Sequence, residues 1–253
     1  MTEGNEFNPS GKEAASQEPK RKRWKRKILL ALCLITVAWL LYEVAAYPDV
    51  RALARDRPQS TAWMEMRDRE ARKEGKRPRR FQVWKPLNSI SSNLKNAVLI
   101  AEDAAFFQHD GLDYDEIREA VKINADKMEF ARGASTITQQ LAKNLYLSPS
   151  KNPVRKLKEL LLTFSLERNL TKRRIFEIYL NVIEWGDGVY GAEAAARTYY
   201  GKSCSDLSDA EAAALAAVII NPRRYSPVQP NRRIRNRTAR IQARMARYRY
   251  YKD

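Results

Sequence analysis

Apolar residues recur at intervals of three or four positions over most of the chain from residue 93 onward. Positions with this spacing lie on one face of an α-helix. Three such stripes are Leu94, Val98, Ala101 and Ala105; Leu157, Leu160, Leu161 and Phe164; and Ile175, Ile178, Tyr179 and Val182. No series of segments alternates between apolar and polar residues with the period of two that half-buried strands require. The pattern therefore predicts a mainly α fold.

Helix-start signals accompany these stripes. Thr171 stands where it would cap the third helix, and Ser208 with Glu211 three residues later forms a capping-box pattern. The helix after Ser208 is predicted to stop at Asn221–Pro222, because proline cannot continue a helix. A further helix is predicted to start near Ser135.

A long apolar run lies near the N-terminus. Residues 28–42 hold no charged side chain, and continuing to Tyr47 gives twenty residues, about 30 Å of helix at ~1.5 Å per residue, which is enough to span a bilayer. Aromatic residues gather toward its end, as in an interfacial belt. The alternative is a cleaved signal peptide, but the run is longer than a typical signal core and no clear small-residue cleavage site ends it. We predict a transmembrane helix over residues 28–47.

The formal net charge of +17 is concentrated in two patches. Seven of the eight residues 20–27 are basic, and residues 223–252 hold eleven Lys or Arg and no acid. Only three Lys or Arg occur within residues 48–64, directly after the apolar run. This imbalance predicts that the N-terminus lies in the cytoplasm and that everything after Pro48 lies outside.

These features divide the chain into five segments. They are a basic cytoplasmic tail (1–27), the transmembrane helix (28–47), a charged juxtamembrane connector (48–92), a helical domain (93–230) and a basic amphipathic C-terminal helix (231–253). The last segment could bind nucleic acid, lie on anionic lipid or pack its apolar stripe on the domain. Because the segment is predicted to lie outside the cytoplasm, we expect no nucleic-acid partner.

Several kinds of site are excluded by composition. The chain has one histidine, His109, and two widely separated cysteines. These cannot build a zinc site of usual composition or a disulfide framework. A Ser-His-Asp triad would need His109, and no nucleophile-elbow motif accompanies it.

Two carboxylates are candidates for catalysis. Glu102 shares a helix face with Leu94 and Val98, where burial would raise its pKa as a general base requires; the alternative is a helix-end glutamate paired with a lysine such as Lys95. Glu159 shares a face with Arg155, Lys158 and Leu162. Two cations beside one carboxylate could bind a pyrophosphate, or Arg155 and Glu159 could be an ordinary surface pair.

A polar segment lies between these two carboxylates. Residues 133–144, GASTITQQLAKN, are dense in hydroxyl and amide side chains. Such side chains could bind a sugar or a phosphate, with help from free N–H groups at a helix start. The alternative is a Ser/Thr helix cap that begins a polar helix face.

Taken together, these segments resemble the five ordered motifs of the peptidoglycan glycosyltransferases of family 51. The matching segments are 102–111 (EDAAFFQHDG), 133–144, 155–159 (RKLKE), 172–181 (KRRIFEIYLN) and 188–202 (GVYGAEAAARTYYGK). Departures are slight: Ala134 stands where a second glycine is common, and Phe176 where leucine is usual. The layout resembles the monofunctional members, because only about 26 residues follow Pro227 and we expect no transpeptidase domain there.

The resemblance implies a two-lobed, lysozyme-like α-helical domain that polymerises glycan strands. The donor would be the growing glycan on undecaprenyl pyrophosphate and the acceptor lipid II, with inversion at the donor carbon. The implied catalytic residues are Glu102, as general base, and Glu159. The implied substrate-binding residues are Ser135, Thr136, Gln139, Gln140, Lys143, Asn144, Arg155 and Lys158, with Lys143, Arg155 and Lys158 beside the leaving pyrophosphate. His109 is expected to fix a loop.

The resemblance also implies a location in the bacterial cytoplasmic (inner) membrane, with other cell-wall synthases as candidate partners. No cofactor is expected to be obligatory, although a divalent cation such as Mg²⁺ could bridge the pyrophosphate. The rival activity is that of a lysozyme-like muramidase or lytic transglycosylase. A hydrolase needs a proton donor for its sugar leaving group but no cluster of cations, so the pair Arg155 and Lys158 favours synthesis.

Overall fold

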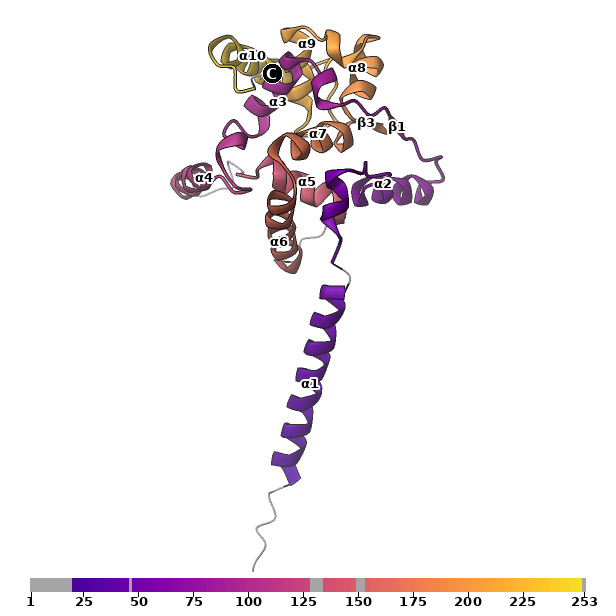
Figure 1. Ribbon diagram of the computed structural model, residues 1–253, viewed down its shortest axis with the longest axis vertical. Coiled ribbons are helices and arrows are strands. Elements are labelled where there is room, and N and C mark those ends of the chain that lie inside the picture. Colours follow the sequence, from indigo (N-terminus) through magenta and orange to yellow (C-terminus); the bar gives the residue numbers. More distant parts are fainter. Residues whose placement is uncertain (1–19, 46, 128–133, 149–152, 252–253) are drawn as a thin grey trace, which may run out of the picture. The chain divides into compact units, whose positions relative to one another are not determined.

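The structure is a computed structural model that describes residues 20–45, 47–127, 134–148 and 153–251. The chain divides into two compact units, Met1–Pro48 and Asp49–Asp253. In the first unit, helix α1 (Lys20–Ala45) covers most of the predicted membrane segment (Figure 1), and apolar side chains such as Leu30 and Ile35 are exposed. Within the described ranges, no helix is both long enough and apolar enough to cross a membrane. Residue 46 of the predicted segment lies outside those ranges.

The second unit is mainly α, as predicted. Its α-helices are α2 (Ala62–Lys73), α3 (Ser92–Glu102), α4 (Tyr114–Lys127), α5 (Ile137–Tyr146), α6 (Pro153–Asn169), α7 (Lys172–Val182), α8 (Ala192–Tyr200), α9 (Asp209–Val218) and α10 (Arg232–Arg247). Short 3-10 helices are η1 (Val50–Ala54), η2 (Leu87–Ser89), η3 (Phe106–Gln108) and η4 (Cys204–Asp206). The strands between these helices are only two or three residues long.

The short strands form one small sheet that the sequence pattern did not indicate. Strands β1 (Phe81–Gln82), β2 (Glu184–Gly186) and β3 (Val189–Tyr190) lie in the order β1-β3-β2. β1 is parallel to β3, with Phe81 opposite Val189, and β2 is antiparallel to β3, with Glu184 opposite Tyr190. Strands of two or three residues are too short to show the alternation by which strands are predicted.

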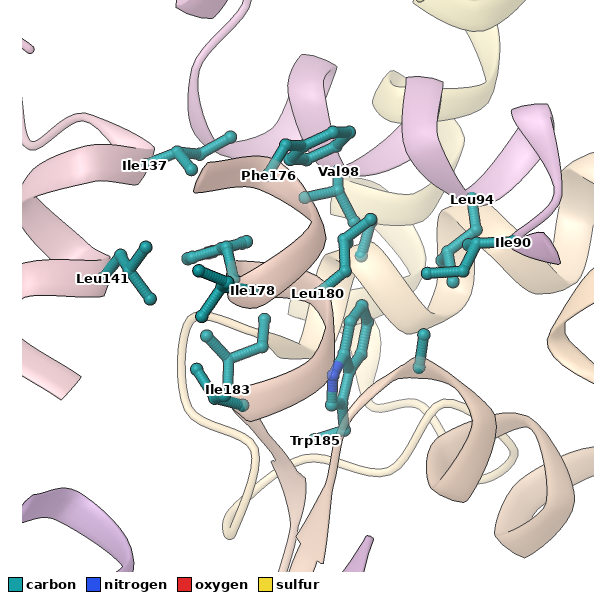
Figure 2. Close-up of a cluster of buried hydrophobic side chains, with 14 of the residues drawn as sticks. Ile90, Leu94, Val98, Ile137, Leu141, Phe176, Ile178, Leu180, Ile183 and Trp185 are labelled. Carbon is teal, nitrogen blue, oxygen red and sulfur yellow. The ribbon is translucent and has the colours of Figure 1, made fainter. Parts of the chain in front are cut away.

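Two groups of helices lie on opposite sides of α7. One group contains α3, α9 and α10, and the other contains α2, α5 and α6 (Figure 1). Figure 2 shows the shared core, in which Val98 of α3, Leu141 of α5 and Ile178 of α7 are completely buried. Burial of such a side chain contributes about 1.5–3 kcal/mol, so the core fixes the helices that carry the polar motifs.

Helix α3 runs through this core and ends at Glu102. Ser91 caps its start by accepting the N–H of Leu94. Every residue from Leu94 to Ile100 is buried, including the polar Lys95 and Asn96. A helix that is packed on all sides holds its last residue firmly, and Glu102 therefore stands at the edge of the core on a rigid support.

The predicted helix caps are confirmed. The Thr171 side chain accepts the N–H of Arg174, and Ser208 and Glu211 satisfy each other's backbone N–H groups in a capping box. Asn231 caps α10 by accepting the N–H of Ile234. Each such cap contributes about 1 kcal/mol, and local sequence was enough to find the first two.

The compact unit begins at Asp49 rather than at the predicted residue 93. Val50 and Leu53 of η1 and Met64 of α2 are buried in the same core as α3. Residues 49–92 therefore belong to the folded unit and are more than a connector. Their apolar positions are separated by many charged residues, which hid the helical spacing.

The C-terminal helix packs its apolar stripe on the domain, which was one of the alternatives. Ile234, Ile241 and Met245 are buried where α10 meets α9 and α3. Tyr248 is more than half exposed, and Tyr251 beyond the helix is buried again. Because the stripe is covered, these three side chains are not available for insertion into a bilayer.

Candidate active site

A cleft of about 870 Å³ opens at the end of α3. One wall is the C-terminal end of α3 with the turn after it, and the other is α10. The residues that precede α5 form part of its floor. The lining side chains that carry charge are Glu102, Asp103, Asp113, Glu116, Arg237, Arg240 and Arg244.

Glu102 is the central carboxylate of the cleft. Its side chain is only 12% exposed. Oε1 accepts a hydrogen bond from Nη2 of Arg237 at 2.9 Å, and Oε2 accepts one from Nε2 of Gln140 at 2.9 Å. Each carboxylate oxygen keeps further lone-pair capacity, so the group can still accept a substrate hydroxyl.

The pKa of Glu102 is raised above the usual value of a glutamate. Burial raises this pKa, and the charge of Arg237, the hydrogen bond from Gln140 and the charge of Lys143 oppose the shift without cancelling it. A carboxylate whose pKa moves toward neutrality is a stronger base when ionised. The predicted property of Glu102 is therefore present.

Gln140 joins Glu102 to helix α7. The Oη of Tyr179 donates to Oε1 of Gln140 at 2.9 Å, and the amide nitrogen of Gln140 donates to Glu102. Burial raises the pKa of Tyr179 well above its usual value, so the phenol keeps its proton and stays a donor. A donor on one side of the amide directs its NH₂ group to the other side, toward the carboxylate.

A second charged centre surrounds Glu159 on α6. Glu159 is 4% exposed, and its oxygens accept from Nη1 of Arg155 at 3.1 Å and from Nζ of Lys156 at 2.5 Å. Lys156 was missed by the sequence analysis, which named Lys158 instead. The available signal was its position three residues before Glu159, a spacing that also brings side chains together on a helix. Lys158 is partly buried on the same helix.

Lys143 links the two carboxylates electrostatically. Burial lowers the pKa of Lys143, and Arg155 and Lys156 lower it further by repulsion. Attraction to Glu159 and, more weakly, to Glu102 acts in the opposite direction. The three cations Lys143, Arg155 and Lys156 therefore form one positive group beside Glu159.

The other polar residues of the segment 133–144 either line the cleft or build helix α5, and Thr136 does both. Ser135, Thr136 and Gln140 line the cleft with Glu102, and Ser135 is exposed. Thr136 and Gln139 are buried and form the capping box that starts α5. Asn144 donates to the carbonyl of Gln140 within α5 at 2.8 Å. Gly133 lies outside the described residues.

Asp103 and His109 hold the loop after α3. Asp103 accepts the N–H of Ile137 at 2.9 Å and lies 3.0 Å from Nε2 of His109, while Nδ1 of His109 accepts the N–H of Gly111 at 3.2 Å. Asp103, His109 and Asp113 lie close enough to form a candidate cation group. Both imidazole nitrogens are already engaged, however, so the ring has no free lone pair for a metal.

Arg237 is the other functional candidate that the sequence analysis missed. It lies on α10, 135 residues after its partner Glu102. Its position three residues after Ile234 and four before Ile241 places it on the buried stripe of that helix. An arginine inside an apolar stripe was the signal that could have indicated a buried partner.

Comparison with known proteins identifies the family. The sequence profile described as Transglycosylase matches residues 69–246, which is well over half of the chain. The chain belongs to the transglycosylase family. Similar transglycosylases, each named biosynthetic peptidoglycan transglycosylase, occur in Dechloromonas aromatica and Methylobacillus flagellatus. The first is 43% identical over 88% of this chain and 95% of its own length, and the second 44% identical over 87% and 94%. A third relative of the same name, from Azoarcus sp., is 45% identical over 80% of this chain and 87% of its own length.

The matched part of this transglycosylase contains the whole cleft. Residues 69–246 include Glu102, the cation group around Glu159 and Arg237 on α10. The helix α10 is therefore part of the family domain.

Proposed function

We propose that this transglycosylase polymerises glycan strands of bacterial peptidoglycan, with the growing lipid-linked glycan as donor and lipid II as acceptor. The observation that carries the proposal is the position of Glu102, a largely buried carboxylate of raised pKa that lines an open cleft. The cation group of Lys143, Arg155 and Lys156 lies near enough for Lys143 to interact with Glu102. A base beside an anion-binding group suits transfer from a sugar pyrophosphate.

In the proposed reaction, Glu102 accepts the proton of the acceptor 4-hydroxyl. The oxygen of that hydroxyl forms a bond with C1 of the donor sugar as the bond from C1 to the lipid pyrophosphate breaks. The electron pair of the broken bond leaves with the pyrophosphate, and attack from the opposite face inverts C1. The pyrophosphate is a good leaving group, so the reaction requires no dedicated acid of the kind that a glycosidase needs.

The cation group is proposed to receive the leaving pyrophosphate. Negative charge grows on the phosphate oxygens as the bond to C1 breaks, and fixed cations stabilise this charge. Lys143, Arg155 and Lys156 supply the positive charge here. Lys158, which lies on α6 with Arg155 and Lys156, is the fourth candidate. Glu159 orients Arg155 and Lys156 and is a candidate for orienting the acceptor. A divalent cation such as Mg²⁺, if bound with the leaving group, would neutralise part of the negative charge on the pyrophosphate.

The donor glycan is proposed to lie along the start of α5. Ser135 offers an exposed hydroxyl there, and Thr136 and Gln140 line the same cleft. Gln139 and Asn144, which the sequence also indicated, contribute through the structure of α5, because the first caps the helix and the second bonds within it. The two helix groups on either side of α7 are proposed to be the two lobes that the resemblance implies.

The enzyme is proposed to work at the outer face of the inner membrane. Peptidoglycan synthesis belongs to the cell envelope, and the lipid tail of the substrate confines it to a bilayer. The exposed apolar side chains of α1 and the basic residues before them support membrane attachment through residues 28–47, with the N-terminus in the cytoplasm. Other cell-wall synthases are candidate partners in that location.

The activity is tested by incubating the detergent-solubilised full chain with labelled lipid II. We expect lipid II to be consumed and long glycan to form, with release of the lipid pyrophosphate. Shortening of finished glycan without consumption of lipid II would instead indicate the muramidase or lytic activity. Repeating the reaction with a metal chelator, followed by added Mg²⁺, tests the cation requirement.

Attachment and topology are tested separately in sealed spheroplasts. Protease added outside should digest the domain and spare about the first 25 residues, as the distribution of basic residues indicates. Full protection of the domain would contradict the proposed location, and recovery of the intact chain in the soluble fraction would contradict attachment.

A further inference from the structure

The C-terminal helix reaches into the cleft through one side chain. Nη2 of Arg237 lies 2.9 Å from Oε1 of Glu102 and 3.1 Å from the carbonyl oxygen of Ala101. One guanidinium nitrogen therefore contacts both the carboxylate and the last turn of the helix that carries it. This contact fixes the carboxylate relative to its own backbone.

We propose that Arg237 is a positioning residue for Glu102, so that α10 completes the catalytic site of the reaction proposed above. This inference rests on the proposed function, in which Glu102 is the general base. Arg237 need not touch substrate. It holds Oε1 of the carboxylate while Gln140 holds Oε2, and the two contacts fix the plane of the carboxylate at the cleft.

The position of Arg237 is fixed by the packing of α10. Ile234, one turn before it, and Ile241, one turn after it, are both buried. Asn231 caps the start of the helix, and Met245 continues the buried stripe. The side chain of Arg237 therefore enters the cleft from a firmly packed helix.

The rest of the guanidinium is not arranged as it would be in a purely structural network. Its Nε is buried and has no hydrogen-bond partner within the described part of the chain. A buried arginine that served only the fold would be expected to have its donors satisfied. The site leaves this donor unpaired while it places Nη2 on Glu102, which favours a role at the carboxylate.

Several other groups face the same carboxylate, and they determine the sign of any pH effect. Lys143 from α5 attracts it and Tyr179 from α7 lies near it. The further titratable or charged residues around it are Asp103, which follows it in the chain, and Asp113, Glu116, Arg240 and Arg244, which line the cleft. Burial already raises the pKa of Glu102, and Arg237 is the first of the opposing influences.

Removal of Arg237 should therefore raise the pKa of Glu102 further. A general base works only when ionised, so the acidic limb of the rate profile should move to higher pH. A loss of positioning should also lower kcat at the pH optimum more than it raises KM, because the carboxylate acts in the transition state. A residue that only stabilised the fold would change neither the pH profile nor the balance between kcat and KM.

The experiment compares four full-length proteins: the wild type, Arg237→Ala, Arg237→Lys and the matched control Arg233→Ala. Arg233 is an exposed arginine of the same helix and does not line the cleft. Initial rates of lipid II polymerisation are measured from pH 5 to pH 9, with melting temperatures alongside. Misplacement of a catalytic group can cost about 10²-fold in rate, and we expect kcat of Arg237→Ala to fall by about ten- to a hundredfold.

The Lys variant keeps a cation and should recover part of the rate and an acidic limb close to that of the wild type. Arg233→Ala should behave as the wild type. An Arg237→Ala profile that is uniformly lowered in step with the folded fraction, without a shifted acidic limb, would overturn the inference. If Arg237→Ala does not fold, the Lys variant decides. A rate that equals its folded fraction, with kcat and KM as in the wild type, would overturn the inference, and a kcat that falls below the folded fraction would support it.

A Glu102→Gln arm separates this inference from the proposed function. If the wild type does not polymerise lipid II, or if Glu102→Gln polymerises it normally, the proposed function or the assignment of the base fails. Suppose instead that the wild type is active, that Glu102→Gln is inactive and that Arg237→Ala keeps the wild-type pH profile. Then only the inference about Arg237 fails, and the proposed function stands.

Discussion

Glu159 is buried and Glu102 is largely buried, and each is paired with an arginine, but their partners lie at very different distances along the chain. Glu159 is held by Arg155 and Lys156, which lie four and three residues before it on the same helix. Glu102 is held by Gln140, 38 residues away, and by Arg237, 135 residues away. The first centre forms with one helix, whereas the second exists only after α3, α5 and α10 have packed together.

This difference has a functional consequence. The partners of Glu159 are cations that can also meet a ligand, and Lys156 is more than half exposed. The partners of Glu102 enclose it, and the pKa of this carboxylate is raised because burial outweighs them. One centre is thus suited to binding charge and the other to transferring a proton.

The largest expected effect is that of Glu102→Gln. The amide keeps the size of the side chain and cannot accept the proton, so polymerisation of lipid II should fall by at least about 10³-fold, within the range for a lost general base. The melting temperature should change little. The measurement is the initial rate with labelled lipid II beside a thermal melt, and near-normal turnover would rule out Glu102 as the base.

Glu159→Gln should have the next largest effect. The change leaves Arg155 and Lys156 without their shared anion, so both cations should become less well placed for the pyrophosphate, and we expect a loss of about 10²-fold, as for other electrostatic contacts to a transition state. In contrast to Arg237→Ala, the acidic limb should stay near that of the wild type. A shifted acidic limb would show that Glu159 carries a proton too.

Lys156→Ala tests how much of the effect of Glu159→Gln comes from one cation. It removes only Lys156, the partner of Glu159 that the sequence pattern did not reveal. Turnover should fall less than in Glu159→Gln. A rate equal to the wild type would mean that Lys156 is an ordinary surface partner of Glu159.

Lys143→Ala tests whether the two centres work together. This lysine interacts with both carboxylates, but Arg155 and Lys156 would still supply positive charge after its removal. We expect kcat to fall by about tenfold or more, because the missing cation stabilises charge that develops in the transition state. Kinetics and melting should be measured together. If activity and melting temperature fall in proportion, Lys143 supports the fold instead.

The difference between the Glu102 and Glu159 centres also explains how much of the site could be predicted from the sequence. Helical spacing located the mainly α fold, and local patterns located the caps at Thr171 and Ser208 and the pair of Arg155 with Glu159, because each depends on residues within one turn. The pairing of Arg237 with Glu102 depends on tertiary packing, which no local pattern records. The roles of the site residues stay predictions until the kinetic experiments are done.

Residues 49–92 show a second reason for incomplete prediction. Their buried residues, such as Val50, Leu53 and Met64, are scattered among charged ones and make contact with distant helices. A short apolar stripe amid many charges has the composition of a connector, although its few apolar side chains are enough to dock it.

The smallest expected effect is that of Thr136→Ala, which removes the buried hydroxyl that caps α5 at the cleft. The Thr136 hydroxyl accepts the N–H of Gln139 and donates to the carbonyl of Gly111 at 2.7 Å. Its loss removes an N-cap, which should cost about 1 kcal/mol of stability. Kinetics with lipid II should change by only a few-fold, mainly through the altered start of α5.

Thr136→Ser is the matched control, because serine keeps the hydroxyl that both hydrogen bonds use. It should restore most of the stability and all of the activity that Thr136→Ala loses. Ser135→Ala, one residue earlier, removes an exposed hydroxyl of the cleft. In contrast to Thr136→Ala, it should raise KM for the donor with little change in melting temperature. If Thr136→Ala raised KM as strongly as Ser135→Ala while melting normally, the buried hydroxyl would have to reach the substrate. The capping box would then open during the reaction, and the start of α5 would be a moving part of the site.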